Sequence, residues 1–170
     1  AEHPLLGAMV GLADSDGFVF TGRLSLAEQP WLAGHAVFDM VVLPGTAFVE
    51  LALVAAHRIG LAVVDELVLE AALVIPARGA VHIQISVGAP DDTGRRSLAV
   101  HARAEGAPGD VAWTRHASGT LAPDGAPPSF DLRAWPPPGA TALATDGLYP
   151  RLAQAGIVYG ADFQGLRAVW

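Results

Sequence analysis

The sequence places a histidine, His35, shortly before a Pro-Gly pair, Pro44-Gly45, that opens a long apolar run. A neutral imidazole can accept a proton near pH 7, so His35 is a candidate general base. Gly45 has no side chain, so its backbone N–H can face a ligand at a helix start, where the peptide dipoles favour negative charge. A base beside such an oxyanion site is suited to removing a proton next to a carbonyl group.

Few other residues have a type and spacing that suit catalysis or metal binding. Asp91-Asp92 and the histidines His82, His101 and His116 have side chains that can bind metals, but none stands at a metal-ligand spacing from a second donor. We therefore interpret them as solvated turn and strand residues and expect no metal site. Gly-rich phosphate-binding patterns are absent, so we expect no nucleotide site and no bound cofactor.

A helix is predicted over residues 46–59, with Thr46 as N-cap and Gly60 as the C-terminal stop. Its apolar composition on most sides is typical of a helix nearly surrounded by protein. The few polar residues share one stripe: Glu50, His57 and Arg58. Within this stripe we expect Glu50 to pair with Arg58 or its neighbours.

Strands are predicted from apolar alternation and Val-rich composition over residues 17–26, 63–75, 81–87, 97–104 and 111–121. Gly- and Asp-rich turns join most of them as antiparallel hairpins. One apolar helix combined with a run of antiparallel strands predicts an α+β fold in which a curved sheet wraps around the central helix.

The chain of 170 residues has the size of one compact domain and is 52% hydrophobic and 16% charged, which excludes a charge-driven disordered chain. The net charge of −7 and the absence of Lys argue against nucleic acid as a partner. Without Cys there is neither a disulfide framework nor a thiolate nucleophile. The sequence shows neither a signal peptide nor an apolar run long enough to span a bilayer, so we expect a cytoplasmic protein without a membrane partner.

Three separated motifs carry a family resemblance. Residues 31–52, WLAGHAVFDMVVLPGTAFVELA, resemble the first active-site motif of the dehydratase domains of modular type I polyketide synthases. Residues 3–7, HPLLG, resemble the opening motif of these domains, and residues 156–166, GIVYGADFQGL, resemble the motif that opens their second half. Because the motifs occur in the right order, the resemblance covers the whole chain. It implies a double hot-dog fold, in which two helix-in-sheet units lie side by side in one polypeptide.

The resemblance divides the chain into three parts. Residues 1–121 would form the N-terminal hot-dog unit, residues 122–146 a Pro- and Gly-rich linker, and residues 147–170 the beginning of the C-terminal unit, which we expect to be incomplete. We expect Trp135 and Phe130 to pin the linker to the protein surface. The C-terminal part is predicted to contain a short helix over residues 147–156 and a strand from Tyr159 to Trp170.

The resemblance also implies roles for single residues. His35 would remove the α-proton of a β-hydroxyacyl thioester that is carried on the phosphopantetheine of an acyl carrier protein. The Gly45 N–H would polarise the thioester oxygen, and Pro44 and Tyr159 would line the substrate site. A catalytic Asp beyond residue 170 would protonate the departing hydroxyl, which gives an α,β-unsaturated thioester, the product of a hydro-lyase. The partners implied are the carrier protein, neighbouring synthase domains and a second copy of the parent synthase.

Two positions depart from the family pattern. Asp39 stands where the family has Gly, and Ala161 stands where it has Pro. Asp tolerates a left-handed backbone better than most residues, and a carboxylate near His35 would raise the basicity of its imidazole. These departures keep open a ring-forming (oxa-Michael) or double-bond-shifting activity, or an inactive structural remnant.

A further alternative rests on Glu50. Its spacing from Pro44-Gly45 matches that of the single hot-dog dehydratases, in which a helix Glu and a His act together across a dimer interface. On that alternative the chain would be a homodimer that uses His35 and Glu50 in trans. If the chain is instead part of a polyketide synthase dehydratase domain, Glu50 is a structural residue.

Overall fold

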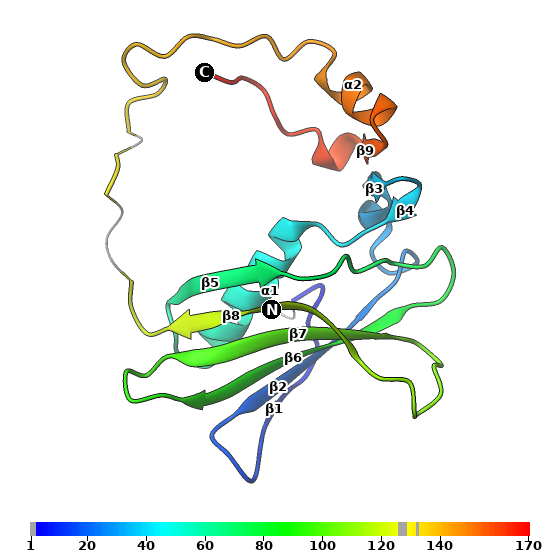
Figure 1. The fold of residues 1–170 in the computed structure, drawn as a ribbon, viewed down its shortest axis with the longest axis vertical. Coiled ribbons are helices and arrows are strands. Elements are labelled where there is room, and N and C mark those ends of the chain that lie inside the picture. The colour runs from blue at the N-terminus through cyan, green and yellow to red at the C-terminus, as the bar shows by residue number, and fades with distance from the viewer. Residues whose placement is uncertain (1–2, 126–128, 132) are drawn as a thin grey trace.

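The computed structural model describes residues 3–125, 129–131 and 133–170 (Figure 1). Part of the predicted linker, Pro127-Pro128 included, therefore lies outside the described residues. None of the helices in the described ranges is long and apolar enough to cross a membrane.

A six-stranded antiparallel sheet curves around one long helix, α1 (Gly45–Arg58), as the sequence predicts (Figure 1). The sheet has the order β1-β2-β6-β7-β8-β5. Its strands are β1 (Met9–Gly11), β2 (Phe18–Leu24), β5 (Val63–Leu69), β6 (Val81–Pro90), β7 (Arg96–Ala104) and β8 (Thr114–Ala122). The short edge strand β1 was not predicted, and β5 ends before the predicted limit of residue 75.

The core lies between the inner face of the sheet and α1. Alternate residues of β6, from Val81 to Val87, are buried, as period-two side-chain alternation requires. The helix contributes Leu51 and the small residues Ala52, Ala55 and Ala56, which are fully buried. Because these alanines are small, the helix backbone lies close to the sheet.

Residues of the polar stripe of α1 bind the N-terminal segment of the chain. Glu50 Oε1 lies 3.3 Å from His3 Nε2, and Arg58 donates a hydrogen bond to the Gly7 carbonyl at 3.1 Å. The predicted pairing of Glu50 with Arg58 or its neighbours in the stripe is therefore wrong. The physical reason is that the N-terminal segment offers both side chains partners that are distant in the sequence.

A second, three-stranded sheet joins the helix-and-sheet body to the C-terminal part. It has the order β4-β3-β9, with β3 (His35–Val37), β4 (Met40–Val41) and β9 (Ile157–Tyr159). The short helices η1 (Pro30–Gly34), α2 (Leu148–Gln154) and η2 (Ala161–Phe163) flank it. The helix predicted over residues 147–156 is thus confirmed as α2.

The strand predicted from Tyr159 to Trp170 is wrong. Strand β9 ends at Tyr159, and the chain turns at once into η2, where the Phe163 N–H donates a hydrogen bond to the Gly160 carbonyl at 2.9 Å. This local turn competes with an extended backbone and ends the strand.

Two residues that precede α2 in the sequence contact the C-terminal residues of the chain. Trp135 packs edge-on against Trp170, with ring centroids 6.0 Å apart, and the Leu143 N–H donates to the Val169 carbonyl at 2.8 Å. Phe130, by contrast, is 67% exposed. Of the two expected anchors, Trp135 packs against another side chain, that of Trp170. The division of the chain at residues 121 and 146 stays a proposal.

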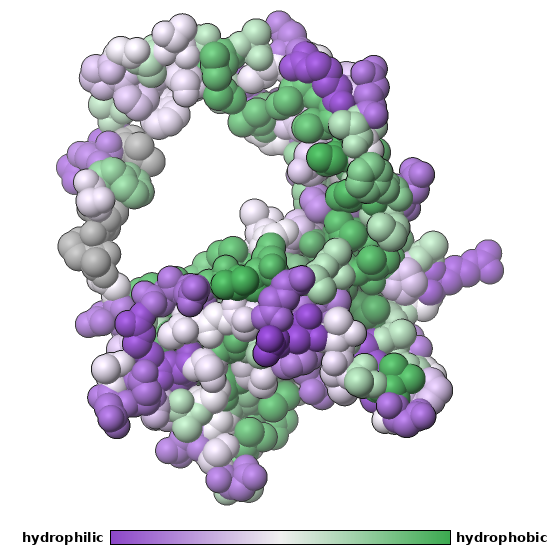
Figure 2. All heavy atoms as spheres, in the orientation of Figure 1, coloured by the Kyte–Doolittle hydropathy of each residue, from purple (hydrophilic) through white to green (hydrophobic). Residues whose placement is uncertain are grey.

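Hydrophobic residues gather along the junction between the body and the C-terminal part (Figure 2). The exposed apolar side chains of α1, β5 and β9 include Val49, Leu69 and Val158. The low charge content of the sequence therefore reflects an apolar surface as well as an apolar core.

Candidate active site

His35 begins strand β3 and is half-buried. It exchanges two hydrogen bonds with Val42: the Val42 N–H donates to the His35 carbonyl at 3.1 Å, and His35 Nδ1 lies 2.9 Å from the Val42 carbonyl oxygen. A carbonyl oxygen can only accept, so Nδ1 carries the proton. In the neutral ring this leaves the lone pair on Nε2, which is the state that a general base needs.

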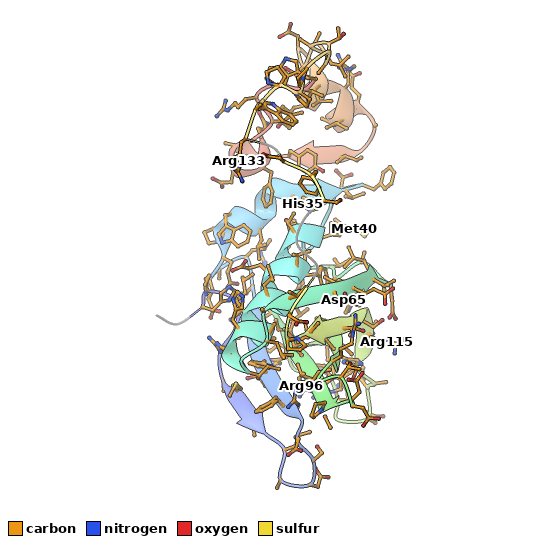
Figure 3. The ribbon with its side chains drawn as sticks, turned by 90° about the vertical axis from the view of Figure 1, so that its left-hand side faces the viewer. His35, Met40, Asp65, Arg96, Arg115 and Arg133 are labelled. Carbon is orange, nitrogen blue, oxygen red and sulfur yellow. The ribbon has the colours of Figure 1, made fainter. Side chains whose placement is uncertain are left out.

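The structure brings Tyr159 directly beside His35. The two residues are cross-strand partners in the β3–β9 pair, and their ring centroids are 5.5 Å apart. Phe163 approaches the imidazole from η2, at 5.3 Å between centroids. Figure 3 shows His35 at the junction between the body and the C-terminal part. Residues 124 positions apart in the sequence thus share one site.

A pair of glycines permits this close approach. The Gly160 N–H donates to the Gly34 carbonyl at 2.7 Å, and a Cβ atom on Gly160 would lie 2.9 Å from the Gly34 Cα. Real Cβ atoms do not approach other atoms this closely, so the β3–β9 contact requires glycine at position 160. Sequence reasoning did not single out these glycines. The available signal was that each lies next to a candidate site residue, Gly34 before His35 and Gly160 after Tyr159.

Helix α1 begins at Gly45, with Pro44 as its N-cap in an extended conformation (φ −61°, ψ 145°). The predicted N-cap Thr46 is wrong, because Pro44 already holds the capping conformation and its carbonyl accepts the Ala47 N–H at 2.9 Å. Within the described residues the Gly45 N–H makes no hydrogen bond. It is therefore an unpaired donor at the helix start, and its role towards an oxyanion stays a prediction.

An apolar groove of about 340 Å³ lies at this end of α1. Its walls include Trp31, Pro44, Thr46 and Phe163. Trp31 and Phe163 also contact one another, with ring centroids 6.0 Å apart. Phe163 lines the groove and also packs against His35, so this one side chain connects the groove with the candidate base. His35, Gly45 and Tyr159 line neither this groove nor two larger hollows of about 520 and 690 Å³.

Asp39 occupies the tip of the β3–β4 hairpin, a two-residue turn in which Phe38 and Asp39 both have positive φ, 46° and 63°. Turns with two positive φ angles favour Gly, Asn and Asp, so Asp39 supplies the backbone conformation for which the family uses Gly. The Phe38 N–H donates to the Gly156 carbonyl at 2.8 Å, which docks the turn on the C-terminal part. Asp39 is exposed, and in the described ranges it forms no ion pair or hydrogen bond with His35.

Ala161 is the first residue of η2 and is exposed. The preceding Gly160 has φ −72° and ψ 176°, the extended conformation that a following Pro requires. The Ala161 N–H makes no hydrogen bond with any described residue. Alanine therefore preserves a backbone that the family's proline also fits.

We expect Ala161→Pro to raise the free energy of unfolding of the complete domain by about 0.4–1 kcal/mol, because Pro restricts the unfolded chain and is accepted at the first helical position. Urea denaturation measures the change, and Ala153→Pro inside α2 serves as a control that should destabilise. A lower stability of the Ala161→Pro variant would contradict the assignment of this backbone.

Two charged networks involve residues of the large sheet and the residues that follow its strands, and His35 is not among their described members. Ser118 and Arg115 donate hydrogen bonds to Glu70 at 2.5 and 2.8 Å and hold the pKa of its carboxyl below the ordinary value. Arg23 donates a hydrogen bond to Glu105 and likewise lowers the pKa of that carboxyl. In the part of the chain that the structure describes, no group of three His, Asp or Glu residues is arranged to hold a metal ion.

Comparison with known proteins gives a consistent result. Residues 3–103 match the family model described as "Polyketide synthase dehydratase domain". The pikromycin polyketide synthase component PikAII of Streptomyces venezuelae is 58% identical over 172 residues, which span all of this chain and 5% of that protein. Mycoketide-CoA synthase of Mycobacterium tuberculosis is 48% identical over 170 residues, again spanning all of this chain and 4% of that protein.

Solved structures of dehydratase domains also resemble this chain. The dehydratase domain from the terminal module of the rifamycin polyketide synthase has a TM-score of 0.90 and 51% identity, with coverage of 99% of this chain and 60% of that one. The erythromycin dehydratase has a TM-score of 0.88 and 47% identity, with coverage of 100% and 63%. The bifunctional dehydratase-cyclase domain from ambruticin biosynthesis has a TM-score of 0.86 and 47% identity, with coverage of 99% and 58%. These likenesses confirm the predicted fold class, an α+β hot-dog fold that forms the first half of a double hot dog.

Proposed function

Because this chain belongs to the dehydratase domain family of polyketide synthases, we propose that it takes part in removing water from a β-hydroxyacyl thioester during polyketide synthesis. The chain spans 5% of the PikAII protein and 60% of the rifamycin dehydratase structure. The activity therefore belongs to the complete dehydratase domain, a hydro-lyase, to which this chain contributes the base and the oxyanion donor.

The hydrogen bond from His35 Nδ1 to the Val42 carbonyl is the observation that carries this proposal. It leaves Nε2 free to take the α-proton of the substrate. As the C–H bond breaks, its electron pair moves towards the thioester carbonyl, and the Gly45 N–H at the start of α1 stabilises the negative charge that develops on oxygen. Collapse of this enolate forms the double bond and expels the β-hydroxyl, which leaves as water once an acid protonates it.

For the acid and the substrate carrier, membership of the family is what supports the proposal. The acid is an Asp on the buried helix of the second hot-dog unit, beyond residue 170. Tyr159 binds near the β-hydroxyl in this proposal, which its ring contact with His35 supports. The substrate arrives on the phosphopantetheine of an acyl carrier protein, and the domain needs no cofactor of its own. The partners are the carrier protein, the neighbouring synthase domains and a second copy of the synthase, in the cytoplasm.

Two observations favour plain dehydration over the alternatives. Asp39 and Ala161 retain the backbone that the family's Gly and Pro would adopt, so neither departure requires an altered site. Glu50 is engaged by His3 on the surface of α1, which argues for a structural role and against a homodimer that uses it in trans.

The test is product analysis with the complete domain. We expect a β-hydroxyacyl thioester on an acyl carrier protein to lose one water and yield the α,β-unsaturated thioester, detected by mass spectrometry and ultraviolet absorbance. A β,γ-unsaturated product or a cyclic ether would identify one of the alternative activities. A folded domain without any product would refute the proposal in favour of an inactive remnant.

A further inference from the structure

A strandless stretch lies between β5 and β6, and part of it runs beside the residue that orients the base. The Leu43 N–H donates to the Leu73 carbonyl at 2.9 Å, and the Ile75 N–H donates to the Val41 carbonyl at 2.9 Å. Between these two bonds Val42 and Val74 form an antiparallel bridge. Residues 71–75, here called the bridging segment, are thus the outer neighbour of Val42, whose carbonyl accepts the His35 Nδ1–H.

The far end of the bridging segment is held by a buried histidine of β8. His116 is only 8% exposed, and its Nδ1 lies 3.1 Å from the Ala71 carbonyl oxygen, so Nδ1 carries the proton and donates. Its own carbonyl accepts the Glu70 N–H at 2.8 Å and the Ala71 N–H at 3.4 Å. This clamp follows the last pair of the β5–β8 ladder, Leu69 with Ala117, and sets where the chain leaves the sheet.

Packing supports only part of the bridging segment. Leu73 and Ile75 are buried in the core, 1% and 2% exposed, whereas Val74 is 42% exposed. A hollow of about 170 Å³, lined in part by Leu73, Val74 and His116, lies beside the segment. Because the hollow removes packing contacts beside Leu73 and Val74, the position of the bridging segment depends more on its hydrogen bonds, including the one from the His116 ring to the Ala71 carbonyl.

We propose that His116 is a positioning residue for His35, acting through the bridging segment and the Val42 carbonyl, an inference that rests on the proposed function. The path runs from the His116 ring to Ala71, along residues 71–75 to Val42, and from there to His35 Nδ1. A displaced bridging segment would shift the Val42 carbonyl and release the imidazole from the orientation and tautomer that leave Nε2 unprotonated. His116 does not touch the substrate in this scheme.

The test compares three variants in the complete domain. His116→Leu keeps the bulk of the side chain but removes the donor, while His116→Asn places an amide N–H close to the position of Nδ1. His101→Leu is the matched control, since His101 lies on neighbouring β7 and makes no hydrogen bond with the bridging segment among the described residues. We expect His116→Leu to lower kcat about tenfold with KM within about twofold, His116→Asn to restore kcat to within about threefold, and the control to match wild type.

A second readout separates positioning from general damage to the fold. In the domain labelled with ¹⁵N-histidine, the long-range ¹H–¹⁵N spectrum shows which His35 nitrogen carries the proton. We expect the Nδ1–H form in wild type and in His116→Asn, and a mixture of tautomers in His116→Leu. If His116→Leu does not fold, His116→Gln replaces it, because its longer side chain moves the donor away from the Nδ1 position.

Two results would overturn the inference. The first is a wild-type kcat together with an unchanged His35 spectrum in His116→Leu. The second is an equal loss of kcat in His116→Leu and in His116→Asn. Failure of the proposed function is a different outcome. In that case wild type forms no unsaturated product, while the nitrogen spectra still report whether His116 controls the His35 tautomer.

Discussion

Replacing His35 with alanine is expected to lower kcat/KM for dehydration by roughly 1,000-fold, within the range that a general base contributes. The α-proton of a thioester is too weakly acidic to leave unaided at neutral pH. The hydrogen bond from His35 Nδ1 to the Val42 carbonyl leaves Nε2 of the neutral ring able to accept it. The proposed oxyanion donor at Gly45 would remain, so the residual rate would reflect polarisation of the carbonyl without a base.

Steady-state assays of the complete domain measure this loss, with thermal unfolding as a check on the fold. His57→Ala is the matched control, because His57 is exposed in the last turn of α1. We expect it to retain wild-type activity. Full activity of the His35→Ala variant would contradict the proposal that His35 is the general base.

The second large effect is expected from Gly160→Ala. The added Cβ would lie 2.9 Å from the Gly34 Cα, so β9 must move away from β3. Because His35 and Tyr159 are direct partners across these strands, the movement separates the base from its neighbour. We expect kcat/KM to fall about 100-fold, as for a displacement of about 1 Å, and the free energy of unfolding to fall by about 1–3 kcal/mol.

Gly165→Ala provides the control for this substitution, since a Cβ atom there meets nothing within 4 Å. It should leave both activity and stability close to wild type. Hydrogen exchange of the Gly160 N–H, which donates to the Gly34 carbonyl, reports directly on the β3–β9 contact. If the backbone N–H at position 160 still exchanges slowly in the Gly160→Ala variant and kcat/KM is unchanged, the glycine pair does not position the site.

Local patterns predicted the regular elements well. The helix expected over residues 46–59 is α1 at Gly45–Arg58, and the strand expected over residues 97–104 is β7 at Arg96–Ala104. These elements are long enough for a repeating apolar pattern to stand out. Strand β1 has three residues and no such repeat, and the expected strand after Tyr159 fails because a turn at Gly160 intervenes.

From residue types and spacing alone, His35 emerged as a candidate base and Gly45 as a candidate oxyanion donor, and the three motifs indicated the family. Only the tertiary structure decided that Val42 orients the imidazole, that the Gly34–Gly160 pair brings Tyr159 to it, and that Glu50 binds His3. The physical reason is that side-chain periodicity and backbone preference depend on residues that are close together in the sequence. Hydrogen-bond partners and close approaches instead depend on which distant segments the folded chain places side by side.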